Sequence, residues 1–131
     1  MLLPLVFAAC GEGLAYAVAE NPHPDPIVMP TSACLPPQCE VIAIKLSDFK
    51  IVPSAMSSQA SRVRFSITNE GTFTHSLELA LDRELFTSPN IGPGQSGFLD
   101  VSVRPGTHTL TCPVTGHAVR GQRATIEVRS R

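Results

Sequence analysis

Residues 62–69 read RVRFSITN, and this stretch decides the fold class because apolar and polar side chains alternate along it. Val63, Phe65 and Ile67 share one parity, while arginine, serine and threonine occupy the other. A period of two places successive side chains on opposite faces of an extended strand. We therefore expect a β-strand here, with one face against a hydrophobic core.

The same alternation recurs along the rest of the chain from residue 41 onward. Turn signals such as Asn69-Glu70-Gly71, Gly92-Pro93-Gly94 and Pro105-Gly106 separate the runs, and no segment keeps a helical period. The pattern predicts an all-β sandwich of six to eight strands over residues 41–129. The residues expected to face the core of this sandwich are Ile42, Ile44, Leu46, Val63, Phe65, Ile67, Phe73, His75, Leu77, Leu79, Leu81, Leu99, Val101, Val103, Leu110, Cys112, Ala124, Ile126 and Val128.

Length and composition exclude several classes of protein. The 131 residues suffice for one domain with a real core. Ten Lys and Arg against eleven Asp and Glu give a net charge of −1, which argues against nucleic-acid binding. There is no Trp and only one Tyr, so stacking platforms for single strands are missing. The longest apolar run, residues 1–10, is too short to span a bilayer.

Residues 1–19 are expected to direct export. Their apolar start ends in Phe7-Ala8-Ala9-Cys10, which resembles a bacterial lipoprotein signal in which Cys10 would receive lipid, although the usual positive segment is absent. Cleavage after Ala15-Tyr16-Ala17 and docking of the segment on the domain remain open alternatives. We expect a periplasmic or membrane-anchored envelope protein that meets the membrane only through such a lipid.

Residues 20–40 contain six prolines and are expected to form a tether or an arm ahead of the domain at 41–131. Cys34 and Cys39 lie in this segment, and a disulfide between them would suit an exported chain. A soft metal site that these two cysteines share with His23 is the alternative; otherwise His23 is expected to be solvated.

The sharpest chemical signal is the stretch CPVTGHAVRGQ, residues 112–122. It places Cys112 and His117 on one turning loop, and the parities of Cys112, Gln122 and the distant His75 point all three toward the core. A buried polar group without a partner costs about 1–3 kcal/mol. Convergence of these side chains on one metal ion would satisfy them together. His108 lies about 13 Å before Cys112 along the same strand and is not expected to share that ion.

Two imidazoles, one thiolate and a weak fourth donor form the ligand set of a trigonal copper site for electron transfer. Residues 41–129 resemble a cupredoxin, a small blue copper protein. The resemblance rests on His75 after Asn-Glu-Gly-Thr-Phe-Thr, the 91–96 turn, the Pro105-Gly106-Thr107 entry and the Cys-x4-His-x4 loop. It implies a Greek-key β-sandwich and one copper ion per chain, with His75, Cys112 and His117 as equatorial ligands.

The chain departs from the family pattern at the axial position, where Gln122 stands instead of the usual Met. Glutamine occurs there in the stellacyanin-like members, so the resemblance still implies copper binding. An amide oxygen is a harder donor than a thioether and favours Cu(II). Ser76 follows His75 where many cupredoxins have Asn, and the resemblance implies that it supports the copper loop or the thiolate through a hydrogen bond.

The resemblance implies a monomeric one-electron carrier and not an enzyme. Its partner would be a cytochrome or a copper oxidase, with Arg120 and Arg123 favouring an acidic one. Three alternatives stay open: a copper storage, delivery or sensing module, an enzyme with a Cys–His pair, and a metal-free sandwich. The GxGxxG match at 92–97 lacks a helix context and is interpreted as a turn. The docking patch around His117 would consist of Pro113, Val114, Ala118 and Val119.

Overall fold

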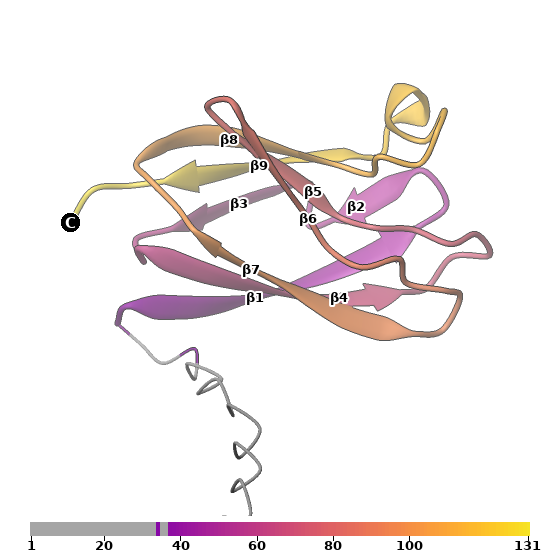
Figure 1. The fold of residues 1–131 in the computed structure, drawn as a ribbon, viewed down its shortest axis with the longest axis horizontal. Coiled ribbons are helices and arrows are strands. Elements are labelled where there is room, and N and C mark those ends of the chain that lie inside the picture. Colours follow the sequence, from indigo (N-terminus) through magenta and orange to yellow (C-terminus); the bar gives the residue numbers. More distant parts are fainter. Residues whose placement is uncertain (1–33, 35–36) are drawn as a thin grey trace, which may run out of the picture. The chain divides into compact units, whose positions relative to one another are not determined.

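In the part of the chain that the structure describes, nine strands form two sheets that pack face to face (Figure 1). The computed structural model describes Cys34 and residues 37–131. The expected export segment with Cys10, His23 and most of the 20–40 tether lie outside the described residues. In the part of the chain that is described, no helix combines the length and apolarity needed to cross a membrane.

The first sheet has the strand order β2-β1-β4-β7. Strand β4 lies at its centre, parallel to β1 and antiparallel to β7, so that Phe65 pairs with Ile42 on one side and Leu99 on the other. These strands are β1 (Cys39–Ser47), β2 (Lys50–Val52), β4 (Arg62–Asn69) and β7 (Ser96–Ser102).

The second sheet has the order β3-β9-β8-β5-β6. Its pairs are antiparallel except β3 with β9, which run parallel. The chain changes sheets between β2 and β3. The strands are β3 (Ala55–Ser58), β5 (Glu78–Leu81), β6 (Glu84–Thr87), β8 (Gly106–Thr111) and β9 (Arg123–Val128). A 3-10 turn, η1 (Ala118–Arg120), lies between β8 and β9.

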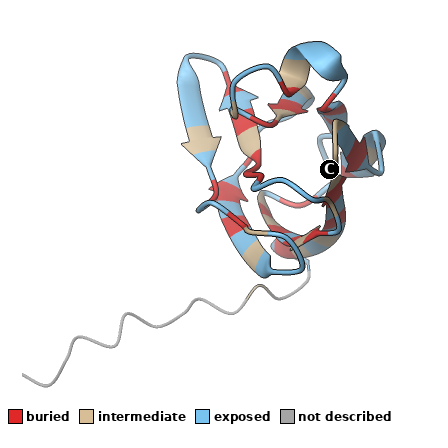
Figure 2. Ribbon diagram, turned by 90° about the vertical axis from the view of Figure 1, so that its right-hand side faces the viewer, coloured by how far each residue is buried: buried red, intermediate tan, exposed pale blue. Residues whose placement is uncertain are grey.

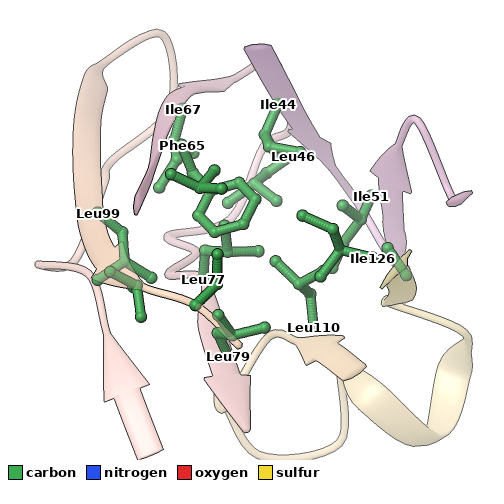
Figure 3. Packing of buried hydrophobic residues seen from close by; sticks show 14 of the residues in the cluster. Ile44, Leu46, Ile51, Phe65, Ile67, Leu77, Leu79, Leu99, Leu110 and Ile126 are labelled. Atoms are coloured by element: carbon green, nitrogen blue, oxygen red, sulfur yellow. The ribbon is translucent and has the colours of Figure 1, made fainter. Parts of the chain in front are cut away.

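The core lies between the two sheets and follows the parities that the sequence predicted. Figure 2 shows buried residues alternating with exposed ones along the strands. Figure 3 shows side chains of β4 meeting those of β5, β8 and β9 across the space between the sheets. The all-β sandwich is therefore confirmed. Its labelled core side chains are Ile44, Leu46, Ile51, Phe65, Ile67, Leu77, Leu79, Leu99, Leu110 and Ile126.

Three sequence-based expectations differ from the structure. The described residues contain nine strands and not six to eight, because the chain changes sheets at Pro53-Ser54, between β2 and β3, and turns back at Asp82-Arg83, between β5 and β6. Strand β1 begins at Cys39, inside the expected tether, since Cys39 already pairs with Arg62. Phe73 was expected to face the core, yet it is 52% exposed. The segment before β5 is a loop, in which strand alternation does not apply.

The central position of β4 gives a test of the core. Truncating Phe65, which is fully buried, is expected to lower the free energy of unfolding by about 3–5 kcal/mol, because a cavity remains. Phe98 on β7 is the matched control: it is 56% exposed and contacts the Arg64 guanidinium. Its truncation is expected to cost less than about 1 kcal/mol. Urea unfolding of Phe65→Ala and Phe98→Ala measures both, and equal losses would contradict the assignment of the core.

Candidate metal centre

Two loops bring His75, Cys112 and His117 together at one end of the sandwich. His75 lies in the loop between β4 and β5, where its backbone exchanges hydrogen bonds of 3.0 and 2.7 Å with Ile91. Cys112 directly follows β8, and its N–H donates to the Gln122 carbonyl at 3.2 Å. His117 precedes η1, and its carbonyl accepts from the N–H groups of Arg120 and Gln122. Backbone hydrogen bonds therefore hold every one of these positions.

The side-chain donors of the three residues converge. Cys112 Sγ lies 3.8 Å from Nδ1 of both His75 and His117, and the two Nδ1 atoms are 3.2 Å apart. Two nitrogens that share an ion at about 2.0 Å lie no more than about 4 Å apart, and a nitrogen and a sulfur no more than about 4.3 Å. The observed spacings satisfy both limits. His75 and Cys112 are fully buried, while His117 is 9% exposed, so this group could hold a metal ion.

The far side of the His75 ring is held by Asp48, a residue that sequence reasoning missed. Nε2 of His75 lies 3.3 Å from Asp48 Oδ1. The Thr72 hydroxyl, above all, lowers the pKa of Asp48 to about 2, and the backbone N–H groups of Thr72 and Phe73 act in the same direction. An ionised carboxylate accepts a hydrogen bond from the N–H group at Nε2, which leaves the Nδ1 lone pair directed at the group.

The loop around His75 is fixed by the buried side chain of Asn69 at the end of β4. Its amide nitrogen donates to the carbonyls of Phe73 and Ile91, both at 2.8 Å, and its oxygen accepts from Gly71 N–H at 2.9 Å. Ser76 is buried beside His75, but the hydrogen bonds that organise this loop come from Asn69. The Asn-x-Gly turn was visible in the sequence, although its function was not.

Gln122 is bonded through its backbone to Cys112 and His117, and its side-chain oxygen has no partner among the described residues. The residue is fully buried, and its amide nitrogen donates to the Ser47 carbonyl at 2.9 Å and to the Lys50 carbonyl at 3.4 Å. Two carbonyl acceptors suit only the NH₂ group, so the orientation of the amide follows from the hydrogen bonds. Oε1 is then the one buried side-chain nitrogen or oxygen without a partner among the described residues. A cation would satisfy this orphaned oxygen.

The remaining candidate residues lie elsewhere or at the rim. Cys34 and Cys39 form a disulfide at the start of β1, so they are not available together as thiolate ligands. His108 donates to the Arg104 carbonyl at 2.8 Å, outside the group. Cys112 is the free cysteine of the described residues. Of the expected docking patch, Pro113 and Val119 are exposed, while Val114 and Ala118 are half-buried.

The solvent side of His117 is covered by two aromatic rings that sequence reasoning did not connect with the site. The Phe49 ring meets the His117 ring edge-on, with centroids 5.3 Å apart. The Phe73 ring lies at 5.9 Å from it. This position explains why Phe73 is turned away from the core. Both residues lie on loops, and the alternation that predicted an inward Phe73 does not apply there.

Known proteins share this arrangement of strands. Auracyanin from the photosynthetic bacterium Roseiflexus castenholzii matches with a TM-score of 0.60, 14% identity, and coverage of 67% of this chain and 95% of its own. Auracyanin B matches with a TM-score of 0.62 and 17% identity, and the match covers 70% of this chain and 89% of its own. Auracyanin A from Chloroflexus aurantiacus is described as a "blue" copper protein. It matches with a TM-score of 0.60 and 14% identity, and the match covers 70% of this chain and 99% of its own. The chain has the cupredoxin fold.

The expected resemblance is thus confirmed at the level of the fold. No protein-family model and no curated protein sequence matches the chain. At these identities the likeness extends to the cupredoxin fold alone.

Gly71 gives a test of how tightly this cupredoxin fold packs around His75. A Cβ at this position would collide with the Asp48 carboxylate and lie 3.0 Å from His75 Nε2. A Cβ at Gly92 would meet the movable end of the Gln95 side chain instead. We expect Gly71→Ala to have a lower melting temperature than Gly92→Ala, because the Asp48–His75 contact cannot yield. Equal melting temperatures by circular dichroism would refute the close packing.

Proposed function

We propose that the chain binds one copper ion between His75, Cys112, His117 and Gln122 and carries single electrons. The observation that carries this proposal is the convergence of one Sγ and two Nδ1 atoms, all within 4.8 Å of one another. A soft thiolate with two imidazoles and a weak further donor is the donor set that suits copper in electron-transfer sites. The fold shared with auracyanin A, described as a "blue" copper protein, supports the assignment.

The residues of the chain prepare the site before any ion enters. Asp48 sets the tautomer of His75, and the Ser47 carbonyl sets the orientation of the Gln122 amide. Strand β8 and backbone hydrogen bonds fix Cys112. Copper in such a site supplies one-electron chemistry by changing between Cu(II) and Cu(I). Because the ligands are held by the protein, they need little rearrangement between the two states.

His117 is the proposed ligand through which electrons pass to a partner, because it is the most exposed of the three. Its ring makes no hydrogen bond to a carboxylate or amide in the described part of the chain. It therefore lacks the orienting group that activates a Cys–His nucleophile pair, which favours a carrier over an enzyme.

The proposal includes the setting in which the carrier acts. The partner would be a cytochrome or a copper oxidase that contacts Pro113, Val114, Ala118 and Val119 beside His117. The carrier would be a monomer in an exported, periplasmic or membrane-anchored location. The Cys34–Cys39 disulfide supports this setting, since disulfides persist in oxidising compartments.

Copper loading tests the proposal directly. Titration of the full chain with Cu(II) is expected to produce an intense visible thiolate charge-transfer band at one ion per chain. Cys112→Ser should lose the band because the thiolate is gone, whereas His108→Ala should keep it because His108 lies outside the group. Visible absorption and EPR report the result. Colourless binding of copper, or an unchanged band in Cys112→Ser, would contradict the proposal. A blue protein that fails to cycle between Cu(II) and Cu(I) would favour copper storage or delivery.

The fourth donor gives a second prediction. Replacing Gln122 by Met exchanges an amide oxygen for a softer thioether, which stabilises Cu(I) relative to Cu(II). We therefore expect Gln122→Met to have a higher reduction potential than the wild type. Protein-film voltammetry of both proteins measures the difference. A potential in the variant that is equal or lower would show that Oε1 does not act on the ion.

A further inference from the structure

The surface outside His117 has an apolar centre. Phe49 and Phe73 flank the His117 ring, and their own centroids are 6.1 Å apart. Phe73 is 52% exposed, and Val119 in η1 is 82% exposed. Exposed apolar residues gathered around one polar group mark an interaction surface. We call Phe49, Phe73 and Val119, together with the His117 ring that they surround, the apolar centre.

Three cations border the apolar centre on one side. The Arg120 guanidinium carbon lies 4.8 Å above the Phe49 ring, on the residue whose ring contacts His117. Lys50 and Arg123 line one surface pocket together with Gly121, which follows Arg120 in the chain. Arg123 uses Nε to bond the Ala118 carbonyl at 3.0 Å, and its two terminal nitrogens are not needed for this bond. We call Lys50, Arg120 and Arg123 the basic rim.

Phe49 links the basic rim to the site. Its φ is +66°, a left-handed conformation that is uncommon for a residue other than glycine. The ring contacts Arg120 and His117. A cation–π contact at an exposed site is worth about 0.5–1 kcal/mol, enough to bias where the guanidinium lies. The positive charge of Arg120 is thereby held near the His117 ring.

Among the described residues, no acidic side chain forms an ion pair with the basic rim. The ion pairs between carboxylates and Lys or Arg in the described residues use other cations, namely Lys45, Arg64, Arg104 and Arg129. Asp48 is the acidic residue nearest in sequence to Lys50, and its oxygens are bonded by Thr72, Phe73 and His75. Within the described part of the chain, these three positive charges therefore have no ion-pair partner, although the whole chain carries −1.

We propose that the apolar centre and the basic rim dock an acidic redox protein, with the rim steering its carboxylates toward His117. This inference rests on the proposed electron-transfer function and adds the charge of the partner. An apolar contact area with charges at its edge is the usual anatomy of such interfaces. Charges at an edge act mainly on the rate of encounter and on its dependence on salt.

Two inorganic reagents test the sign of the local charge without an identified partner. Hexacyanoferrate(III), an anion, takes one electron from the Cu(I) protein and leaves hexacyanoferrate(II) and the Cu(II) protein. Tris(phenanthroline)cobalt(III), a cation, takes one electron in the same way and becomes cobalt(II). Stopped-flow rates for the full chain are expected to fall with ionic strength for the anion and to rise for the cation. The net charge of −1 would by itself produce the opposite signs.

Charge reversal locates the effect. Arg120→Glu and Lys50→Glu are expected to slow the reaction with the anion by about 3- to 10-fold at low salt. Arg83→Glu is the matched control, because it changes the net charge equally from the exposed turn between β5 and β6. It should change the rate little. An unchanged visible spectrum in each variant shows that the site itself is intact.

A polypeptide probe tests the same surface at the scale of a protein. Poly-L-glutamate added to the Cu(I) protein is expected to shift the backbone NMR signals of residues 49–50 and 118–123, and not those of residues 82–84. Rates that rise with salt for the anion, or equal slowing by Arg83→Glu and Arg120→Glu, would overturn the inference while leaving the carrier function intact. A chain that takes up no copper would overturn both.

Discussion

The buried amide of Asn69 is the interaction on which the site depends. From the end of β4 it bonds the carbonyls of Phe73 and Ile91 and the N–H of Gly71. These bonds connect the last residue of a central strand to the two loops whose backbones pair at His75 and Ile91. The amide therefore transmits the regularity of the sheet to a segment that has no regular structure. Asp48 can reach His75 only because this loop is held, and because Gly71 leaves room.

Much of the fold could be predicted because strand alternation is a local property of the sequence. The burial of Phe65, Leu110 and Ile126 follows from the alternation of apolar and polar residues around them. The same alternation correctly predicted that Cys112 and Gln122 are buried. Prediction failed where alternation ends. Phe73 lies in a loop and is exposed, and the contact between Asp48 and His75 joins residues 27 positions apart. Such contacts depend on tertiary packing, which no short stretch of sequence records.

The site combines two requirements that oppose each other. In the proposed electron carrier, the donors of His75 and Cys112 are buried so that they are held rigidly and kept from water, whereas an electron would leave through a group near the surface. The structure separates these tasks among residues. His75 and Cys112 lie inside the sandwich, and His117 lies at its edge behind Phe49 and Phe73. Aromatic rings exclude water there while leaving the imidazole close to an approaching surface.

The anchoring of Gln122 has an evolutionary consequence. Its amide is held by carbonyls of Ser47 and Lys50, which belong to the β1–β2 hairpin and not to the loop that carries Cys112 and His117. The β1–β2 hairpin thus orients the side-chain amide, whereas the backbone of Gln122 is bonded to Cys112 and His117. Insertions or deletions between residues 112 and 117 could therefore remodel the loop while the side-chain oxygen of Gln122 keeps its place. The length of the segment between Cys112 and His117 can thus change while the Ser47 and Lys50 carbonyls continue to orient the Gln122 amide.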